Sequence, residues 1–169
     1  MNLRLRIALF CFAAFTFIGC DRITKDLARE HLANREAISY FHDVFRLQYA
    51  ENTGAALNLG DDLSRPASFW LLSMLPLVLL LLLFGYTLTN LKTLDSTRSF
   101  SFILIFSGGI GNIIDRLLYD RHVPDFLNLG INNFRTGIFN VADICVTLGV
   151  IGILYATLRK GPAGKSIIS

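Results

Sequence analysis

The chain has 169 residues, of which 53% are hydrophobic and 17% charged, and its mean hydropathy is +0.50. These values indicate a single bilayer-embedded domain (1–169), and the scattered net charge of +3 argues against a nucleic-acid-binding surface. Cys11, Cys20 and Cys145 lie in or beside apolar runs without C-x-x-C spacing, which argues against a disulfide framework or a zinc site.

Four apolar runs predict four transmembrane helices. The runs at 69–89 and 138–158 are long enough alone, because a helix needs roughly 20 residues to cross about 30 Å of hydrocarbon. Two shorter runs become spans, at 7–24 and 99–117, if the other helices shelter Asp21 and Asp115 from lipid. The predicted fold class is therefore a mainly α membrane protein.

The first run also has the features of a removable leader. Residues 1–20 have a basic start, an apolar middle and Cys20 at the position where a lipoprotein leader is cut. Its removal would leave three spans and put the basic tail on the wrong side of the membrane. We therefore expect it to be retained as the first span, with a lipid-anchored binding protein that begins at Cys20 as the alternative.

Between the first two spans lies an extracytoplasmic segment at about 25–68. Its first part, 23–37, mixes apolar and charged residues and predicts an interfacial helix that continues the first span. The stretch 41–59 begins with alternating apolar and polar residues, which is typical of a strand. We therefore expect a small extracytoplasmic β-sheet.

Lysine and arginine in the flanking segments predict that both termini are cytoplasmic, since such residues are enriched on that side. The basic residues of these flanks are Arg4 and Arg6, then Lys92 and Arg98, and finally Arg159, Lys160 and Lys165. The segment 21–68, by contrast, has more acidic than basic residues.

The third span carries polar residues behind a glycine-rich stretch. Its glycines allow close helix contact, and Asn112 and Arg116, four residues apart, share a helix face. One interpretation is ordinary small-residue packing capped by the pair Asp115-Arg116. The other is that the amide and the guanidinium hold the carbonyl oxygens of a bound peptide.

Two aspartates flank the last span at the outer surface, Asp125 in the preceding loop and Asp143 inside the apolar run. Asp125 alone would be interpreted as a loop-surface carboxylate. Asp143 lies about a turn and a half into the run, beyond the usual capping position. Burying its charge there is costly, which indicates that the carboxylate has a function. Two carboxyls sharing one proton can activate water and polarise a carbonyl, which is the chemistry of aspartic peptidases, and the loop is long enough for the two to meet.

Four blocks of sequence carry a family resemblance: Asp21-Arg-Ile-Thr-Lys25, Asn52-Thr-Gly-Ala-Ala56, Gly111-Asn-Ile-Ile-Asp-Arg116 with Val123-Pro-Asp-Phe126, and Phe139-Asn-Val-Ala-Asp143. In this order they resemble the lipoprotein signal peptidase (signal peptidase II) family over nearly the whole chain. The resemblance implies an aspartic endopeptidase of the bacterial inner membrane that needs no cofactor or metal. It would remove signal peptides from prolipoproteins, cutting before a diacylglyceryl-modified cysteine, and its partners would be these substrates and membrane lipid, with the enzyme itself a monomer.

The resemblance also assigns roles to residues. Asp125 and Asp143 match the catalytic pair. The positions that match the substrate groove are Asn52, Gly54, Asn112, Arg116 and Asn140. Supporting roles fall to Asp21, Lys25 and Asp115, and the four-residue spacing of Asp21 and Lys25 suits an ion pair at the membrane edge.

The chain departs from the family pattern at two places. Pro124 stands where a β-branched residue is usual, but proline favours an extended approach to Asp125, so we expect catalysis to survive. Leu57-Asn58 replaces an aromatic followed by a small residue, which affects loop packing or substrate preference. The alternatives to the peptidase are a small transporter and a non-catalytic, diverged paralogue that binds lipoprotein precursors.

Overall fold

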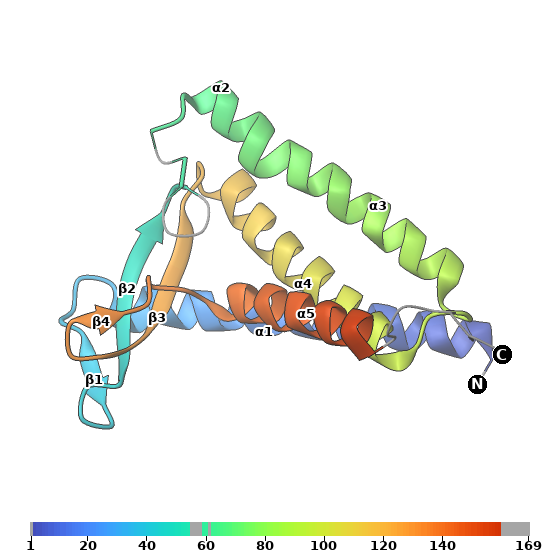
Figure 1. Cartoon of the computed structure of the whole chain (residues 1–169). Coiled ribbons are helices and arrows are strands. Elements are labelled where there is room, and N and C mark those ends of the chain that lie inside the picture. The colour runs from blue at the N-terminus through green and yellow to red at the C-terminus, as the bar shows by residue number, and fades with distance from the viewer. Residues whose placement is uncertain (1, 55–58, 61, 160–169) are drawn as a thin grey trace, which may run out of the picture.

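The structure, a computed structural model, describes residues 2–54, 59–60 and 62–159. Within this part of the chain, four helical stretches are long and apolar enough to span a membrane: Leu3–Leu32, Arg65–Asn90, Ser96–Leu118 and Val141–Arg159. Figure 1 shows these helices with a small sheet at one end. The predicted class, a mainly helical membrane protein with four spans and a small sheet, is confirmed.

Helix α1 (Leu3–Leu32) continues without a break from the first span into the segment 23–37, where an interfacial helix was predicted, but it ends five residues before that segment does. The second span is built from α2 (Arg65–Ser68), a π-helical turn η2 (Phe69–Met74) and α3 (Leu75–Asn90). Helix α4 (Ser96–Leu118) starts at Asp95, whose side chain accepts a hydrogen bond from the Arg98 amide at 2.9 Å. The last helix is α5 (Val141–Arg159).

Helix α4 is the centre of the bundle and packs against α1, α3 and α5. Its contact with α5 depends on glycine, because a Cβ built on Gly108 would lie 2.3 Å from the carbonyl oxygen of Ala142. A Cβ on Gly149 of α5 would similarly lie 2.7 Å from the carbonyl oxygen of Ser101. The glycine-rich stretch thus brings the backbones of the two helices together, as its sequence predicts.

The sheet is antiparallel, with the order β1-β2-β3-β4. Its strands are β1 (Ile38–Tyr40), β2 (Phe45–Asn52), β3 (Val123–Ile131) and β4 (Phe134–Arg135). The strand expected from residue 41 begins at Phe45, because residues 41–44 form a turn in which Phe41, His42 and Asp43 have positive φ. Pairing of β2 with β3 sets Ala50 opposite Asp125 and Asn52 opposite Val123.

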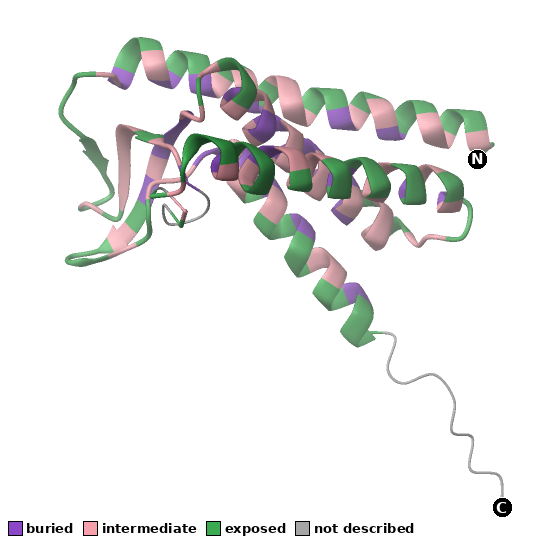
Figure 2. Ribbon diagram, turned by 90° about the horizontal axis from the view of Figure 1, so that it is seen from above, coloured by how far each residue is buried: buried purple, intermediate pink, exposed green. Residues whose placement is uncertain are grey.

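The sheet lies at one end of the bundle (Figure 1). The first residues of α1, the connection between α3 and α4, and the last turn of α5 share the end away from the sheet. Figure 2 shows exposed residues along the helices and buried ones where the helices meet. Several buried residues are charged or polar, and Asp21, Lys25, Asp115, Asp125 and Asn140 are among them.

Candidate active site

Asp125 lies on β3, so its predicted placement in the loop before the last span was wrong, and the alternative of a loop-surface carboxylate fails as well. Its side chain is buried because β3 pairs with β2 on one edge and contacts the segment before α5 on the other, through a bridge between Leu127 and Phe139. Its carboxylate accepts hydrogen bonds from Asn52 Nδ2 at 3.1 Å and Asn140 Nδ2 at 2.6 Å. Asn52 reaches it as a diagonal neighbour on the same face of the sheet.

Asp143 stands in the first turn of α5, so the prediction that it lies beyond the capping position was also wrong. The Asn140 side-chain oxygen accepts a hydrogen bond from the backbone N–H of Asp143 at 3.0 Å. In return, the Asp143 carboxylate accepts a hydrogen bond from the backbone N–H of Asn140 at 3.0 Å. This reciprocal pair is a capping box, with Asn140 before the helix and Asp143 three residues later. The capping contacts fix the carboxylate in position at the helix start.

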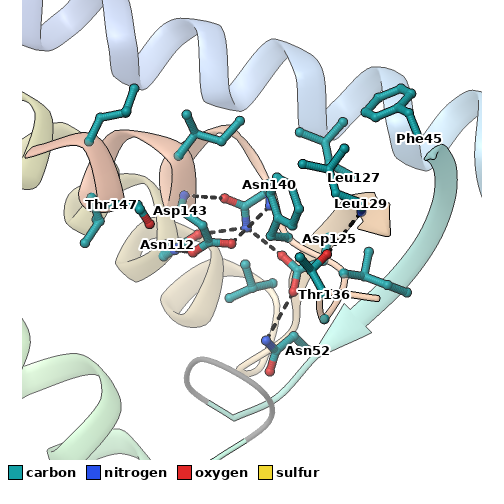
Figure 3. A pocket seen from close by; sticks show the side chains of 17 residues that line it. Phe45, Asn52, Asn112, Asp125, Leu127, Leu129, Thr136, Asn140, Asp143 and Thr147 are labelled. Carbon is teal, nitrogen blue, oxygen red and sulfur yellow. Dashed lines mark hydrogen bonds between the residues drawn. The ribbon is translucent and has the colours of Figure 1, made fainter. Parts of the chain in front are cut away.

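Asn140 therefore joins the two aspartates: its side chain donates to Asp125, and its backbone donates to Asp143. Both carboxylates line one cavity of about 800 Å³ together with Asn52, Asn112 and Asn140 (Figure 3). The rest of the cavity wall is mainly apolar and comes from the sheet, residues 136–139 and α5. It includes Leu127, Leu129, Phe139, Ile144 and Leu148.

The electrostatics of the cavity favour a shared proton. Burial, with the adjacent charge of Asp143 as the next cause, raises the pKa of Asp125 to about 6. Hydrogen bonds from Asn52 and Asn140 act in the opposite direction but are outweighed. The pair can thus hold one proton on Asp125, and peptide hydrolysis by two carboxyls requires that one of them be protonated.

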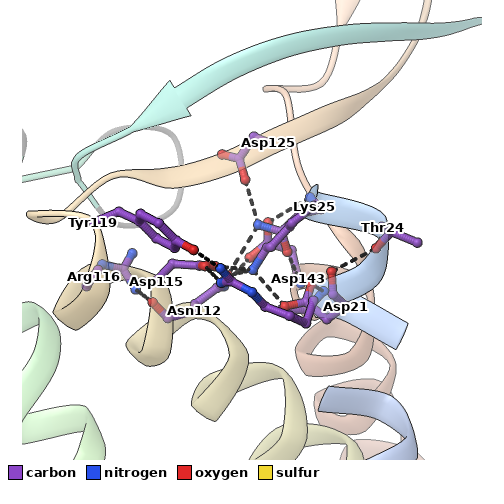
Figure 4. A network of polar contacts seen from close by, with 12 residues as sticks. Asp21, Thr24, Lys25, Asn112, Asp115, Arg116, Tyr119, Asp125 and Asp143 are labelled. Carbon is purple, nitrogen blue, oxygen red and sulfur yellow. Dashed lines mark hydrogen bonds and ion pairs between the residues drawn. The ribbon is translucent and has the colours of Figure 1, made fainter. Parts of the chain in front are cut away.

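A buried ionic network lies behind the asparagines (Figure 4). Lys25 Nζ is 2.7 Å from Asp21 and 2.7 Å from Asp115, and Arg22 forms a second ion pair with Asp115. The predicted pairing of Asp21 with Lys25 is confirmed. Asp21 also accepts a hydrogen bond from the Ala142 amide at 2.8 Å, which ties α1 to the beginning of α5.

Two further predicted groove residues lie beside the cavity and do not line it. Arg116 Nη2 donates to the Gly54 carbonyl at 2.8 Å, and the Gly54 amide donates to Asn52 Oδ1 at 2.9 Å. Arg116 thus holds the chain that follows β2. Ala55, Ala56, Leu57 and Asn58 of this segment lie outside the described residues.

Two features around the site were not predicted from the sequence. One is Arg22, which pairs with the buried Asp115, and the other is the apolar wall formed by β3 and residues 136–139. Arg22 gives no sequence signal, because its partner lies on another helix. The alternation of Asp125, Leu127 and Leu129 could have revealed β3.

Comparison with known proteins places these features in context. The family model described as signal peptidase (SPase) II matches residues 13–159. The chain is 35% identical to a lipoprotein signal peptidase of Nostoc punctiforme over 163 residues, covering 95% of this chain and 96% of that protein. It is 36% identical to a lipoprotein signal peptidase of Clostridium tetani over 141 residues, covering 83% and 86%.

A solved structure has the same fold. It is described as a bacterial membrane enzyme determined by the in meso method at 2.3 Å resolution. The TM-score is 0.79 at 25% identity, and the superposition covers 96% of this chain and 95% of the other.

Proposed function

This chain belongs to the signal peptidase II family, the lipoprotein signal peptidases, and we propose that Asp125 and Asp143 are the catalytic pair with which it cuts prolipoproteins. It is thus an aspartic peptidase and a bacterial multi-pass membrane protein, and membership of the family favours the peptidase over the transporter alternative. The observation that carries the assignment is the Asn140 contact to both carboxylates at one end of an apolar cavity.

The two acids take different roles in this proposal. Asp143, ionised, accepts a proton from the attacking water, and Asp125, protonated, donates a hydrogen bond to the scissile carbonyl oxygen. Water oxygen adds to the carbonyl carbon, and the C–N bond then breaks as a proton passes to the leaving amine. The raised pKa of Asp125 supports its assignment as the proton donor.

The substrate reaches the cavity from the membrane. Ile144 and Leu148 of α5 belong both to the cavity wall and to the exposed apolar surface of the helix, so the cavity continues onto a surface suited to lipid. A signal helix could approach along this surface with the acyl chains of its diacylglyceryl cysteine still in the bilayer. Burial of about 0.8 kcal/mol per methylene would hold the cysteine near the acids, and cleavage would occur just before it.

Neutral polar groups line the substrate path. Asn52, Asn112 and Asn140 border the cavity and are the candidates for contact with the peptide backbone. Gly54 and Arg116 lie beside the path, where the hydrogen bond between them holds the chain that follows β2. The active site lies at the outer face, both termini lie in the cytoplasm of a bacterial inner-membrane protein, and the enzyme acts as a monomer.

The proposal is tested by processing of a diacylglyceryl-modified prolipoprotein in proteoliposomes. Asp125→Asn and Asp143→Asn should insert normally and each lose nearly all activity. Asp120→Asn is the matched control, because among the residues that the structure describes the ion-pair partner of Asp120 is the exposed Arg65 at the same end of the bundle. Full activity in either active-site variant would refute the catalytic pair, and a paralogue that only binds precursors would leave the wild type inactive as well.

A further inference from the structure

The ammonium group of Lys25 contacts three oxygens. Its Nζ lies 2.7 Å from Asp21 Oδ2, 2.7 Å from Asp115 Oδ2 and 2.8 Å from Asn112 Oδ1. The contacts to Asp21 and Asn112 are hydrogen bonds and the contact to Asp115 is an ion pair, in a side chain that is 0% exposed. Two of the acceptors neutralise the buried charge, and the third is an uncharged amide that faces the cavity.

The contact to Asn112 fixes which way its amide points. An ammonium group can only donate, so the Asn112 oxygen must face Lys25 and its nitrogen must face away. Asn140 Nδ2 also donates to this oxygen, at 3.2 Å. On the far side, Asn112 Nδ2 donates to Asp143 Oδ1 at 2.9 Å (Figure 4).

Both oxygens of Asp143 consequently accept hydrogen bonds, Oδ1 from Asn112 and Oδ2 from the Asn140 backbone. Donors aimed at both oxygens favour the ionised carboxyl over the protonated one. We propose that Lys25 is a positioning residue that, through the Asn112 amide, holds the hydrogen-bond donor to Asp143 in place and so keeps Asp143 the base of the pair. The inference rests on the proposed function and adds which residues hold Asp143 in its role as the base.

Other charged groups surround Asp143 and set the background for this effect. They are Asp21 and Lys25 on α1, Asp115 and Arg116 on α4, and Asp125 on β3. Arg116 is the second cation of this group, and Asp21, Asp115 and Asp125 are acids like Asp143 itself. Of the two cations, only Lys25 also bonds to the Asn112 side chain.

The test is the pH dependence of kcat/KM for prolipoprotein cleavage by Lys25→Met. Without the ammonium group, the Asn112 oxygen keeps only the longer hydrogen bond from Asn140, so the donor to Asp143 is held less firmly. The optimum should therefore move to higher pH by about one unit. The loss at pH 5 should exceed the loss at pH 8 by about tenfold or more, since a hydrogen bond to a charged group is worth about that much. If Lys25 had a purely structural role, Lys25→Met would lower kcat/KM by the same factor at every pH and leave the optimum in place. That result would overturn the proposal.

A double-variant cycle separates the amide from the direct field of the charge. In an Asn112→Ala background, Lys25→Met should shift the optimum much less than in the wild type. An equal shift in both backgrounds would refute action through the amide. Arg22→Met is the matched control, because Arg22 pairs with Asp115 but has no contact to Asn112, and it should leave the optimum in place.

Asn112→Asp keeps the test decisive if Lys25→Met fails to fold. It retains an oxygen for Lys25 but replaces the donor to Asp143 with an acceptor, so the optimum should again rise, and an unchanged optimum would overturn the proposal. Failure of the proposed function looks different, because activity would then survive Asp143→Asn whatever happens at position 25.

Discussion

Asp125→Asn should abolish cleavage and yet make the folded protein more stable at pH 8. A carboxyl whose pKa rises from 3.8 to about 6 on folding destabilises the fold when ionised, and the cost is about 3 kcal/mol because one pKa unit is about 1.4 kcal/mol. Asparagine removes this cost and can still accept the hydrogen bond from Asn140. It loses the one from Asn52, worth about 1 kcal/mol, so a net gain of about 2 kcal/mol remains.

The stability gained by Asp125→Asn should increase with pH. The folded-state pKa lies above the unfolded one, so the cost develops as pH rises from about 4 to about 6 and is complete above that. Thermal unfolding in detergent should show Tm higher by about 4–8 °C at pH 8 for the variant, with the difference shrinking toward pH 4. Asp120→Asn, at an exposed position, should change Tm little at any pH. A variant less stable than the wild type at pH 8, or a difference independent of pH, would refute this reasoning.

Two further predictions concern the proton and the helix contact. Because Asp125 must keep its proton, kcat/KM should decline as pH rises through about 6; a profile that keeps rising to pH 8 would contradict its role as the donor. Gly108→Ala should destabilise the fold by about 2 kcal/mol or more, since its Cβ would lie 2.3 Å from the Ala142 carbonyl oxygen. Gly19→Ala is the control: its Cβ meets no atom within 4 Å, so it should change stability by about 0.5 kcal/mol or less. Thermal unfolding of the two variants decides this, and equal Tm values would contradict the close α4–α5 contact.

The four spans and the pair Asp21-Lys25 could be predicted because they depend on local pattern. Apolar length reports a membrane helix directly, and a four-residue spacing places two side chains on one helix face. The burial of Asp125 could not be predicted in this way. It depends on pairing between β2 and β3, whose residues lie far apart in the sequence.

The start of α5 was misjudged for a physical reason. Ile138 and Phe139 extend the apolar run and suggest helix, but Phe139 pairs with Leu127 and completes the edge of β3 instead. Asn140 and Asp143, three residues apart, carried a capping signal that would have corrected the boundary. The contact from Lys25 to Asn112 gave no such signal, since it joins α1 to α4.

The central claim is that the two aspartates act as one catalytic unit. Its most direct test is single-turnover cleavage of a diacylglyceryl-modified prolipoprotein by the wild type, Asp125→Asn, Asp143→Asn and the double variant. Each single variant should lose at least about a thousandfold in rate, and the double variant should be no slower than either, because removing one member already disables the pair. Substantial cleavage by either single variant, or losses that multiply in the double variant, would contradict the claim.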